Sequence, residues 1–234
     1  MVKKMFSMLV VATTNKNKLR EFREILTGMN FEVRSLDDFG PIPPAIEDGA
    51  TFEENAYKKA LHTARVLGLP AIADDSGLVV LALNGQPGVH SARYAGEEAD
   101  DDKNCGKLLQ ELAGKTERRA HFQCVLSIAV PSGPALTYEG RCDGVIIDEK
   151  RGNNGFGYDP LFYFPELGKT FAELSAEEKN RVSHRGKALA ELKSEIQMVE
   201  KWLNQRLAEE KPPRPDHSEF MANDWSATKK GWES

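Results

Sequence analysis

The chain has 234 residues, of which 40% are hydrophobic and 29% charged, and its formal net charge is −5. A chain of this size can bury roughly 70% of its unfolded surface, so it needs neither disulfides nor a structural metal. The composition excludes a collagen-like or wholly disordered protein, and apolar runs such as Met8–Ala12 fall far short of the ~20 residues of a membrane-spanning helix.

Charge and cysteine content restrict the partners and the compartment. The 31 basic residues do not outnumber the 36 acidic ones, which argues against broad nucleic-acid binding but not against a small polyanionic ligand. Cys105, Cys124 and Cys142 are odd in number and lack CxxC spacing, so we expect reduced thiols and no cysteine-held zinc. Because no secretory signal follows Lys3 and Lys4, we expect a cytoplasmic protein without a membrane partner.

The first third of the chain predicts alternating strands and helices. Leu19, Phe22 and Leu26 are spaced three and four residues apart, which predicts a helix behind an apolar strand. Thr51 and Glu54 have the spacing of a capping box, which opens a second helix. The expected elements are a strand over Phe6–Thr13, a helix over Asn15–Leu26, a strand over Phe31–Leu36, a helix from Thr51 to Leu67, and short strands over Ala71–Ala73 and Leu78–Leu83.

The remainder predicts a long hairpin and a helical end. Apolar residues alternate along His121–Val130, the turn Pro131–Pro134 follows, and Leu136–Ile147 returns as the partner strand. Helices are expected over Ala99–Leu112 and Arg185–Ala208. The predicted fold is α/β, with a mixed central sheet that contains a long antiparallel hairpin and with two lobes flanking a substrate cleft.

We expect one domain over residues 1–210 and a flexible tail over 211–234. Pro212, Pro213 and Pro215 prevent a helix at the start of this tail. Its aromatic residues, among them Trp225 and Trp232, leave open a tail that docks on its own domain or on a partner.

The segment at the end of the first strand has the character of an anion site. Backbone N–H groups at a helix start, together with hydroxyl, amide and ammonium side chains, favour a phosphate. The alternative is an ordinary N-cap with solvated lysines. The residues concerned are Thr13, Thr14, Asn15, Lys16, Asn17 and Lys18.

Acidic residues suggest a metal site. Asp74 and Asp75 end a buried strand, where adjacent carboxylates are costly unless they bind a metal or accept hydrogen bonds. Because strand side chains alternate, one can face a cleft while the other supports structure. Glu47 could reach the same cleft, and such oxygen ligands suit Mg²⁺, although a simple turn would also explain the two aspartates.

Three further segments could contribute to a site. Asn55 and Lys59 share a helix face and could present an amide and a cation to a phosphate, or simply form a solvated face. Gly155–Pro160 places glycines beside aromatic rings and an aspartate, as a stacking loop or a tight structural loop would. Ser183–Lys187 offers several donors at a helix start, suited to keto oxygens or phosphate, or is an N-cap with a basic first turn.

Six of these segments match one family in order along the chain. The motifs are TxNxxK at Thr13–Lys18, FxENAxxKA at Phe52–Ala60, DDSGL at Asp74–Leu78, SARYAG at Ser91–Gly96, GFGYDPLF at Gly155–Phe162 and SHRGKAL at Ser183–Leu189. Over about residues 8–207 the chain resembles the inosine/xanthosine triphosphate pyrophosphatases, also called dITP/XTP pyrophosphatases.

The resemblance implies Mg²⁺-dependent hydrolysis of ITP, dITP and XTP to the monophosphate and pyrophosphate, in a homodimer. It implies that Asp75 accepts the proton and that Glu47 and Asp75 hold the metal. The implied substrate-binding residues are Thr13–Lys18, Lys59, Ser76, Phe156, Gly157, Tyr158, Asp159, Lys179, His184 and Arg185. Within this set, Phe156 would stack on the base, and Lys179, His184 and Arg185 would close on its 6-keto group.

Two other functions stay open at this point. One is a Maf-like pyrophosphatase acting on other modified nucleotides, against which the segments Gly155–Phe162 and Ser183–Leu189 argue. The other is a purine nucleotide binder without turnover, against which Glu47, Asp75 and Lys18 argue, because a pure binder has no use for a metal-held water.

Overall fold

The computed structural model describes residues 7–209. The expected tail over 211–234 therefore lies outside the described residues. Within 7–209, no helix is both long enough and apolar enough to cross a bilayer.

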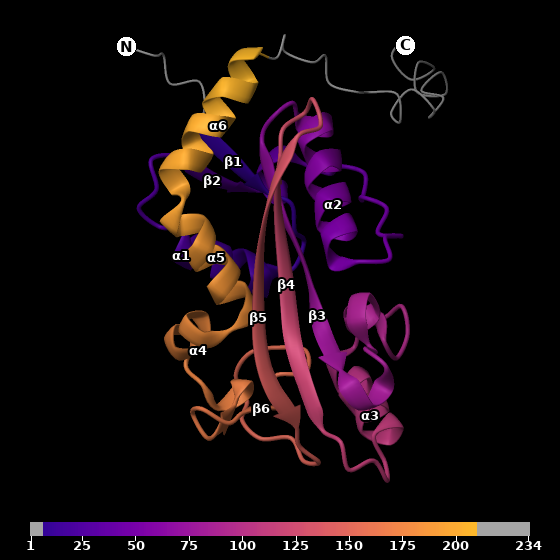
Figure 1. Ribbon diagram of the computed structural model, residues 1–234. Coiled ribbons are helices and arrows are strands. Elements are labelled where there is room, and N and C mark those ends of the chain that lie inside the picture. Colours follow the sequence, from indigo (N-terminus) through magenta and orange to yellow (C-terminus); the bar gives the residue numbers. More distant parts are fainter. Residues whose placement is uncertain (1–6, 210–234) are drawn as a thin grey trace, which may run out of the picture.

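One mixed sheet of seven strands forms the centre of the protein, in the order β2-β1-β3-β4-β5-β6-β7. Strand β1 pairs in parallel with β2 and β3, whereas the pairs from β3 to β7 are antiparallel. Helix α2 lies on one side of the long strands, with α5 and α6 on the other (Figure 1). The strands are β1 (Met8–Val11), β2 (Glu32–Ser35), β3 (Ala71–Val80), β4 (Arg119–Ala129), β5 (Ala135–Ile146), β6 (Phe162–Phe164) and β7 (Lys169–Thr170).

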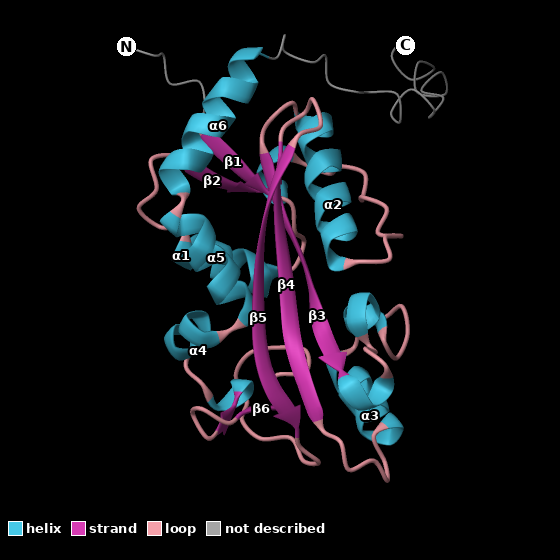
Figure 2. Cartoon of the chain, in the orientation of Figure 1, coloured by secondary structure: helices cyan, strands magenta, loops and turns pink. Residues whose placement is uncertain are grey.

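Helices cover both faces of this sheet (Figure 2). The α-helices are α1 (Lys16–Ile25), α2 (Phe52–Leu67), α3 (Asp101–Glu111), α4 (Ala176–Val182), α5 (His184–Ser194) and α6 (Ile196–Glu209). Short 3₁₀ helices cover Leu36–Phe39, Leu81–Leu83, Gly88–Arg93 and Phe171–Glu173. The mixed α/β class and the long hairpin, formed by β4 and β5, are confirmed.

Strand β3 corrects the sequence prediction most. We expected a strand that ended at Ala73, a turn, and a second strand over Leu78–Leu83. Instead β3 continues through Asp74–Gly77, because it pairs with β4 at every position from Ala71 to Val80 and the ladder satisfies its backbone. Leu81–Leu83 is a 3₁₀ helix, and the turn interpretation of the two aspartates is wrong.

The C-terminal helix was also predicted too simply. The expected helix over Arg185–Ala208 is two helices, α5 and α6, separated at Glu195. Glu195 leaves the helical backbone conformation, and its carboxylate accepts a hydrogen bond from Tyr138 at 3.2 Å. Helix α3 begins two residues later than expected, because the Asp100 side chain caps it by accepting from the Lys103 N–H.

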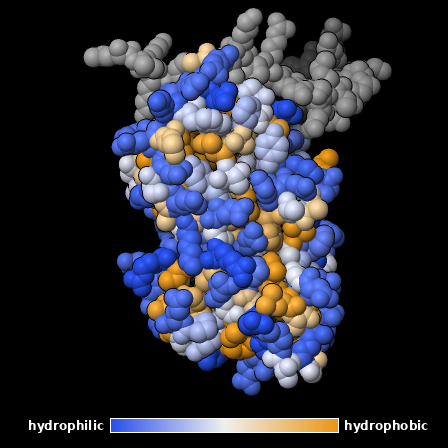
Figure 3. All heavy atoms as spheres, in the orientation of Figure 1, coloured by the Kyte–Doolittle hydropathy of each residue, from blue (hydrophilic) through white to orange (hydrophobic). Residues whose placement is uncertain are grey.

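The buried apolar residues form two main clusters, which gives the two lobes a physical basis. One contains the rings of Phe122, Phe162 and Phe171, whose centroids lie 4.7–5.8 Å apart. The other packs β1, α1, α5 and α6 around residues such as Phe22 and Leu189. On the face shown in Figure 3 hydrophilic residues predominate, and hydrophobic residues appear mainly in the half away from the chain ends.

Strand β4 shows which side chains share a face of the sheet. Val125 clusters with Phe52 of α2, whereas Leu126 clusters with Leu189 of α5. Alternate residues of the long strands therefore face α2 and α5 in turn.

Gly140 allows α5 to approach the sheet closely. A Cβ at this position of β5 would overlap the carbonyl oxygen of His184 and lie 2.7 Å from the Ala188 nitrogen. We expect Gly140→Ala to lower the free energy of unfolding by about 1–3 kcal/mol, because backbone atoms must move apart. Gly106 lies on α3, and a Cβ there would meet no described atom within 4 Å apart from its chain neighbours and the backbone of its own helix. Gly106→Ala should therefore raise the free energy of unfolding by up to about 1 kcal/mol.

Denaturant titration of both variants measures this difference. Equal stabilities for Gly140→Ala and the unmodified protein would contradict the close approach of α5.

Candidate active site

Asp74 and Asp75 lie on opposite faces of β3. Asp75 is paired in register with Val125, on the α2 face, and Asp74 with Leu126, on the α5 face. The predicted division between the two carboxylates therefore holds, and each belongs to a different group of charged residues.

On the α2 face, Lys59 joins the two predicted metal ligands. Its ammonium lies 3.0 Å from Glu47 Oε2 and 2.7 Å from Asp75 Oδ1. Burial raises the pKa of Asp75, although Lys59 opposes this. Burial has the opposite effect on Lys59 and would lower its pKa. The charges of Asp75, Asp74 and Glu47 outweigh burial, so the pKa of Lys59 is raised.

The sequence suggested that Asn55 presents its amide to a phosphate, but the structure gives this amide other partners. It is 3% exposed, and its Oδ1 accepts the Gly49 N–H at 2.8 Å. Its Nδ2 donates to Asp75 Oδ2 at 3.4 Å. Asn55 thus ties the loop that carries Glu47 to the strand that carries Asp75.

The donor chemistry of this face fits magnesium. Within residues 7–209 no three His, Cys, Asp or Glu side chains form a group that could hold a metal. Glu47 and Asp75 are nevertheless brought together, since one ammonium contacts both. Mg²⁺ is commonly bound by one or two carboxylates with waters and substrate phosphates completing its shell, so this pair suits it when a triphosphate is present.

On the α5 face, Asp74 is the centre of a buried group. Its Oδ2 lies 2.9 Å from Lys18 Nζ and 3.0 Å from Arg185 Nη2, and it accepts the Ser76 hydroxyl at 2.9 Å. Burial alone would raise the pKa of Asp74, but Lys18 and Arg185 outweigh it and hold that pKa far below its usual range. Its Oδ1 is buried without a hydrogen-bond partner among the described residues.

The ion pairs continue from Arg185 through two further residues to Asp159. Arg185 Nη1 pairs with Glu21 of α1, and Glu21 Oε1 lies 3.6 Å from Lys179 Nζ. Lys179 in turn lies 2.5 Å from Asp159 Oδ2. The six residues of this buried ion-pair chain alternate in sign: Lys18, Asp74, Arg185, Glu21, Lys179 and Asp159.

A cavity of about 160 Å³ opens beside this chain. It is well below the roughly 300–1,000 Å³ of sites that enclose a whole drug-sized ligand, so it suits a base rather than a complete nucleotide. Phe156 forms one wall, with the Lys179 ammonium 4.6 Å from its ring centre. The predicted residues that line the cavity are Asn15, Lys18, Ser76, Phe156, Gly157, Tyr158, Asp159, Lys179, His184 and Arg185.

His184 brings a neutral imidazole to this cavity. It stacks on Phe122 at 4.7 Å between ring centroids, and its Nδ1 is buried with no hydrogen-bond partner in the described structure. Burial, with the charges of Arg185 and Lys179, lowers the pKa of His184 well below its usual value. The imidazole can therefore donate or accept a hydrogen bond without carrying charge.

The loop that carries Phe156 is held by two of its own side chains, those of Asp159 and Tyr158. Gly155 has φ of +78°, and a Cβ there would overlap the carboxylate of Asp159. That carboxylate accepts the Phe156 N–H at 2.9 Å. The Tyr158 hydroxyl donates to Ser91 O at 2.8 Å, so Tyr158 ties the loop to the segment that contains Ser91.

The start of α1 differs from the expectation. Asn15 Oδ1 accepts the N–H groups of Asn17 and Lys18, so these two amides are not free for an anion. Thr13, Thr14 and Lys16 line neither the cavity nor the groove described next. In this structure, Lys18 is therefore the cation of the segment nearest to both Asp74 and the cavity.

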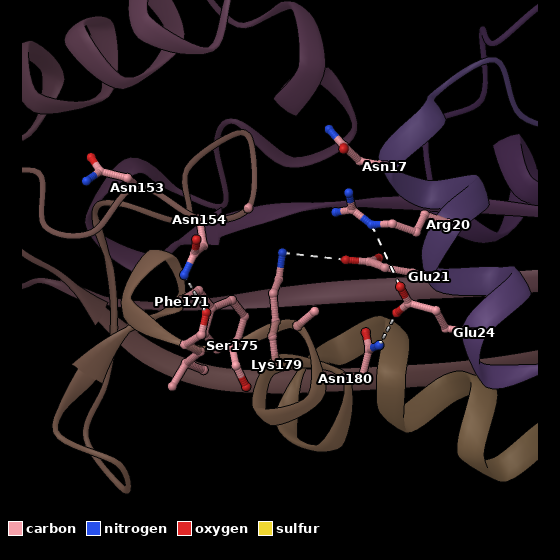
Figure 4. A pocket seen from close by; sticks show the side chains of 13 residues that line it. Asn17, Arg20, Glu21, Glu24, Asn153, Asn154, Phe171, Ser175, Lys179 and Asn180 are labelled. Carbon is pink, nitrogen blue, oxygen red and sulfur yellow. Dashed lines mark hydrogen bonds and ion pairs between the residues drawn. The ribbon is translucent and has the colours of Figure 1, made fainter.

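A second groove, of about 700 Å³, lies behind Lys179 between α1, α4 and the loop at Asn153 and Asn154 (Figure 4). Figure 4 shows the Lys179 side chain extending toward Glu21 across this groove. Asn17 lines this groove rather than the cavity. Lys179 and Gly155–Phe156 thus separate two adjoining hollows.

At Asp74 and Asp75, β3 has one edge without a described partner strand. Among the described strands, β1 pairs with β3 only at Ala71 and Ile72, so β3 has no neighbouring strand on that side at Asp74 and Asp75. Lys59 helps to lower the pKa of Asp74, and Lys18 likewise opposes the rise in the pKa of Asp75 that burial causes. An extended polyanion lying over this edge would contact both groups of charges.

Sequence reasoning missed Glu21, and it named no partner for Asp74. Glu21 is 7% exposed and directly precedes the core residue Phe22. An acidic residue beside the apolar stripe of a helix was the available signal, because such a position is buried and requires a cation.

Comparison with known proteins identifies the family of the chain. The model of the Ham1 family matches residues 9–195. The chain belongs to the Ham1 family. This confirms the resemblance drawn from the motifs, because relatives that match most of the chain are named dITP/XTP pyrophosphatase.

Two such relatives are named dITP/XTP pyrophosphatase. That of Desulfotalea psychrophila is 71% identical, covering 95% of this chain and 100% of the relative. That of Syntrophobacter fumaroxidans is 63% identical, covering 87% and 88%. The solved structure of a HAM1 protein from Coxiella burnetii is 43% identical with a TM-score of 0.77, covering 82% of this chain and 100% of that one.

Asp74 should dominate the stability of this site. We expect Asp74→Asn to lower the free energy of unfolding by about 3–5 kcal/mol, because it leaves the buried Arg185 and Lys18 undercompensated. Asp48→Asn, which removes an exposed partner of Lys58, should leave stability unchanged. Denaturant titration at neutral pH measures both.

The ion pairs of Asp74 with Lys18 and Arg185 also make the free energy of unfolding depend on pH. The pKa of Asp74 is lower in the folded than in the unfolded state, so its contribution is complete above about pH 4 and declines as the pH falls further. The unmodified protein should lose this stability on acidification and Asp74→Asn should not. Parallel stability curves for the two proteins would contradict the assignment.

Proposed function

We propose that the protein hydrolyses noncanonical purine nucleoside triphosphates, namely ITP, dITP and XTP, to the monophosphate and pyrophosphate, with Mg²⁺. The observation that carries this is a base-sized cavity lined by cationic donors, next to a pair of carboxylates suited to a metal. The names of its Ham1 relatives, dITP/XTP pyrophosphatase, support this class of substrate and a hydrolase acting on phosphoric anhydrides.

The triphosphate would lie over the open edge of β3. There Lys18 and Lys59 approach from the two faces and would offset its charge, as phosphoryl transfer requires. Thr13, Thr14, Asn15, Lys16 and Asn17 would line the approach from α1, and the Ser76 hydroxyl would contact the substrate.

Glu47 and Asp75 would hold Mg²⁺, which when bound supplies charge compensation for the triphosphate. Asp75 would accept the proton from the water that attacks the α phosphorus. The bond between the α phosphorus and the α–β bridging oxygen breaks, and pyrophosphate leaves with that oxygen. A carboxylate positioned beside the attacking water can accept its proton.

The base would enter the cavity against Phe156, with Gly157, Tyr158 and Asp159 behind it. Lys179 and Arg185 carry only donors, and Nδ1 of His184 has no hydrogen-bond partner within residues 7–209. Hypoxanthine and xanthine present an acceptor oxygen at position 6, whereas adenine presents a donor there. Each donor left unpaired costs on the order of 1–3 kcal/mol, which disfavours ATP.

Other expectations from the sequence remain part of this proposal. We propose that the chain acts as a cytoplasmic homodimer and that residues 1–210 suffice for the activity, with 211–234 as a tail.

The activity is tested by incubating the purified protein with Mg²⁺ and ITP, XTP, GTP or ATP and separating the products. We expect IMP or XMP with pyrophosphate, and little product from ATP or GTP. Asp75→Asn should keep the fold and lose nearly all turnover, because it removes the proton acceptor and a metal ligand.

Release of orthophosphate with IDP would overturn the placement of Asp75 beside the α phosphorus. Binding of ITP without any product over hours would indicate a nucleotide binder, and turnover confined to modified pyrimidine nucleotides would indicate a Maf-like enzyme.

Phe156 should act on substrate binding. We expect Phe156→Ala to raise KM for ITP about tenfold, because stacking on a base contributes roughly 1–3 kcal/mol, with a smaller change in kcat. Phe156→Tyr keeps the ring and should restore KM. Steady-state kinetics that show neither constant moved in Phe156→Ala would refute the stacking role.

A further inference from the structure

Lys59 already occupies the space between the two carboxylates proposed to hold the metal. Its ammonium lies 3.0 Å from Glu47 Oε2 and 2.7 Å from Asp75 Oδ1. The Lys59 and Asp75 side chains are 13% and 10% exposed, so water and salt screen this contact much less than a surface pair. The two carboxylates thus share one cation that the chain itself supplies.

A divalent ion bound to both carboxylates would need the same space. Mg²⁺ sits about 2.0–2.1 Å from its oxygen ligands, so an ion in contact with both oxygens would crowd the Lys59 ammonium. Two cations this close repel strongly, because the Coulomb energy rises as their separation falls. Lys59 must therefore leave at least one carboxylate before a metal can contact both.

We propose that Lys59 is the resident cation of this site in the free protein and moves to the triphosphate when metal and nucleotide bind together. The inference rests on the proposed function, which makes Glu47 and Asp75 the metal ligands. The lysine stem is flexible and its ammonium can rotate, so the group can exchange one oxygen partner for another.

The exchange keeps the charges compensated throughout. In the free protein, the ammonium of Lys59 stands between the carboxylates of Glu47 and Asp75. In the complex, the Lys59 ammonium would leave this position to the divalent ion and would contact phosphate oxygens. Free metal must displace Lys59 with no phosphate to receive it, so metal and nucleotide should each raise the affinity for the other.

The chain supplies a matched control one residue away. Lys58, also on α2, pairs with Asp48 Oδ1 at 2.6 Å, and these side chains are 41% and 70% exposed. Replacing Lys58 makes the same change in net charge without clearing the space between Glu47 and Asp75. A difference between the two replacements therefore reports position rather than overall charge.

The test is titration of Mn²⁺ into the nucleotide-free protein, with free Mn²⁺ followed by electron paramagnetic resonance. We expect Lys59→Met to bind Mn²⁺ at least about tenfold more tightly than the unmodified protein, because a nearby positive charge is removed. Lys59→Gln should do the same, and Lys58→Met and Lys59→Arg should keep the weak affinity. Circular dichroism checks that each variant is folded.

Glu47→Gln separates the failure of this inference from the failure of the proposed site. Added to Lys59→Met, it should abolish the gain in Mn²⁺ affinity. If the unmodified protein and Lys59→Met bind equally tightly, and Glu47→Gln weakens both, the metal site stands and the exchange is wrong. If Mn²⁺ binding to Lys59→Met is absent or insensitive to Glu47→Gln, both the metal site and the exchange are wrong.

Discussion

Arg185 is a permanent cation with 2% of its surface exposed, held between the carboxylates of Asp74 and Glu21. A charge buried this deeply is tolerated only with good partners, so α1, β3 and α5 must keep fixed positions around it. Gly140 allows this, because the start of α5 lies directly against β5. The position of the cavity beside Phe156 follows from that packing.

The alternation of a single strand separates two kinds of chemistry. Asp74 faces α5 and belongs to the buried ion-pair chain beside the cavity, while Asp75 faces α2 and contacts Lys59. Because β1 pairs with β3 only as far as Ile72, no described strand lies beside β3 on that side at Asp74 and Asp75. Under the proposed function, recognition of the base and hydrolysis of the triphosphate are thus kept apart but adjacent.

Local patterns predicted the elements well where the signal was local. The hairpin of β4 and β5 was predicted from alternation and a proline-glycine turn, and α2 from Thr51, whose hydroxyl accepts the Glu54 N–H. Glu54 itself reaches the Ala50 N–H instead of that of Thr51. Predictions failed where a distant partner decided, as when β4 held β3 in a continuous ladder through Asp74–Gly77.

The sequence by itself determined the fold class, the family motifs and the residue types of the site. Only the tertiary structure decided their partners: Glu21 between Arg185 and Lys179, Asn55 on the Glu47 loop, and Lys59 between two carboxylates. The physical reason is that periodicity and capping depend on neighbours along the chain. Which charge compensates which depends on burial and on segments that meet only after folding, such as Glu21 and Arg185.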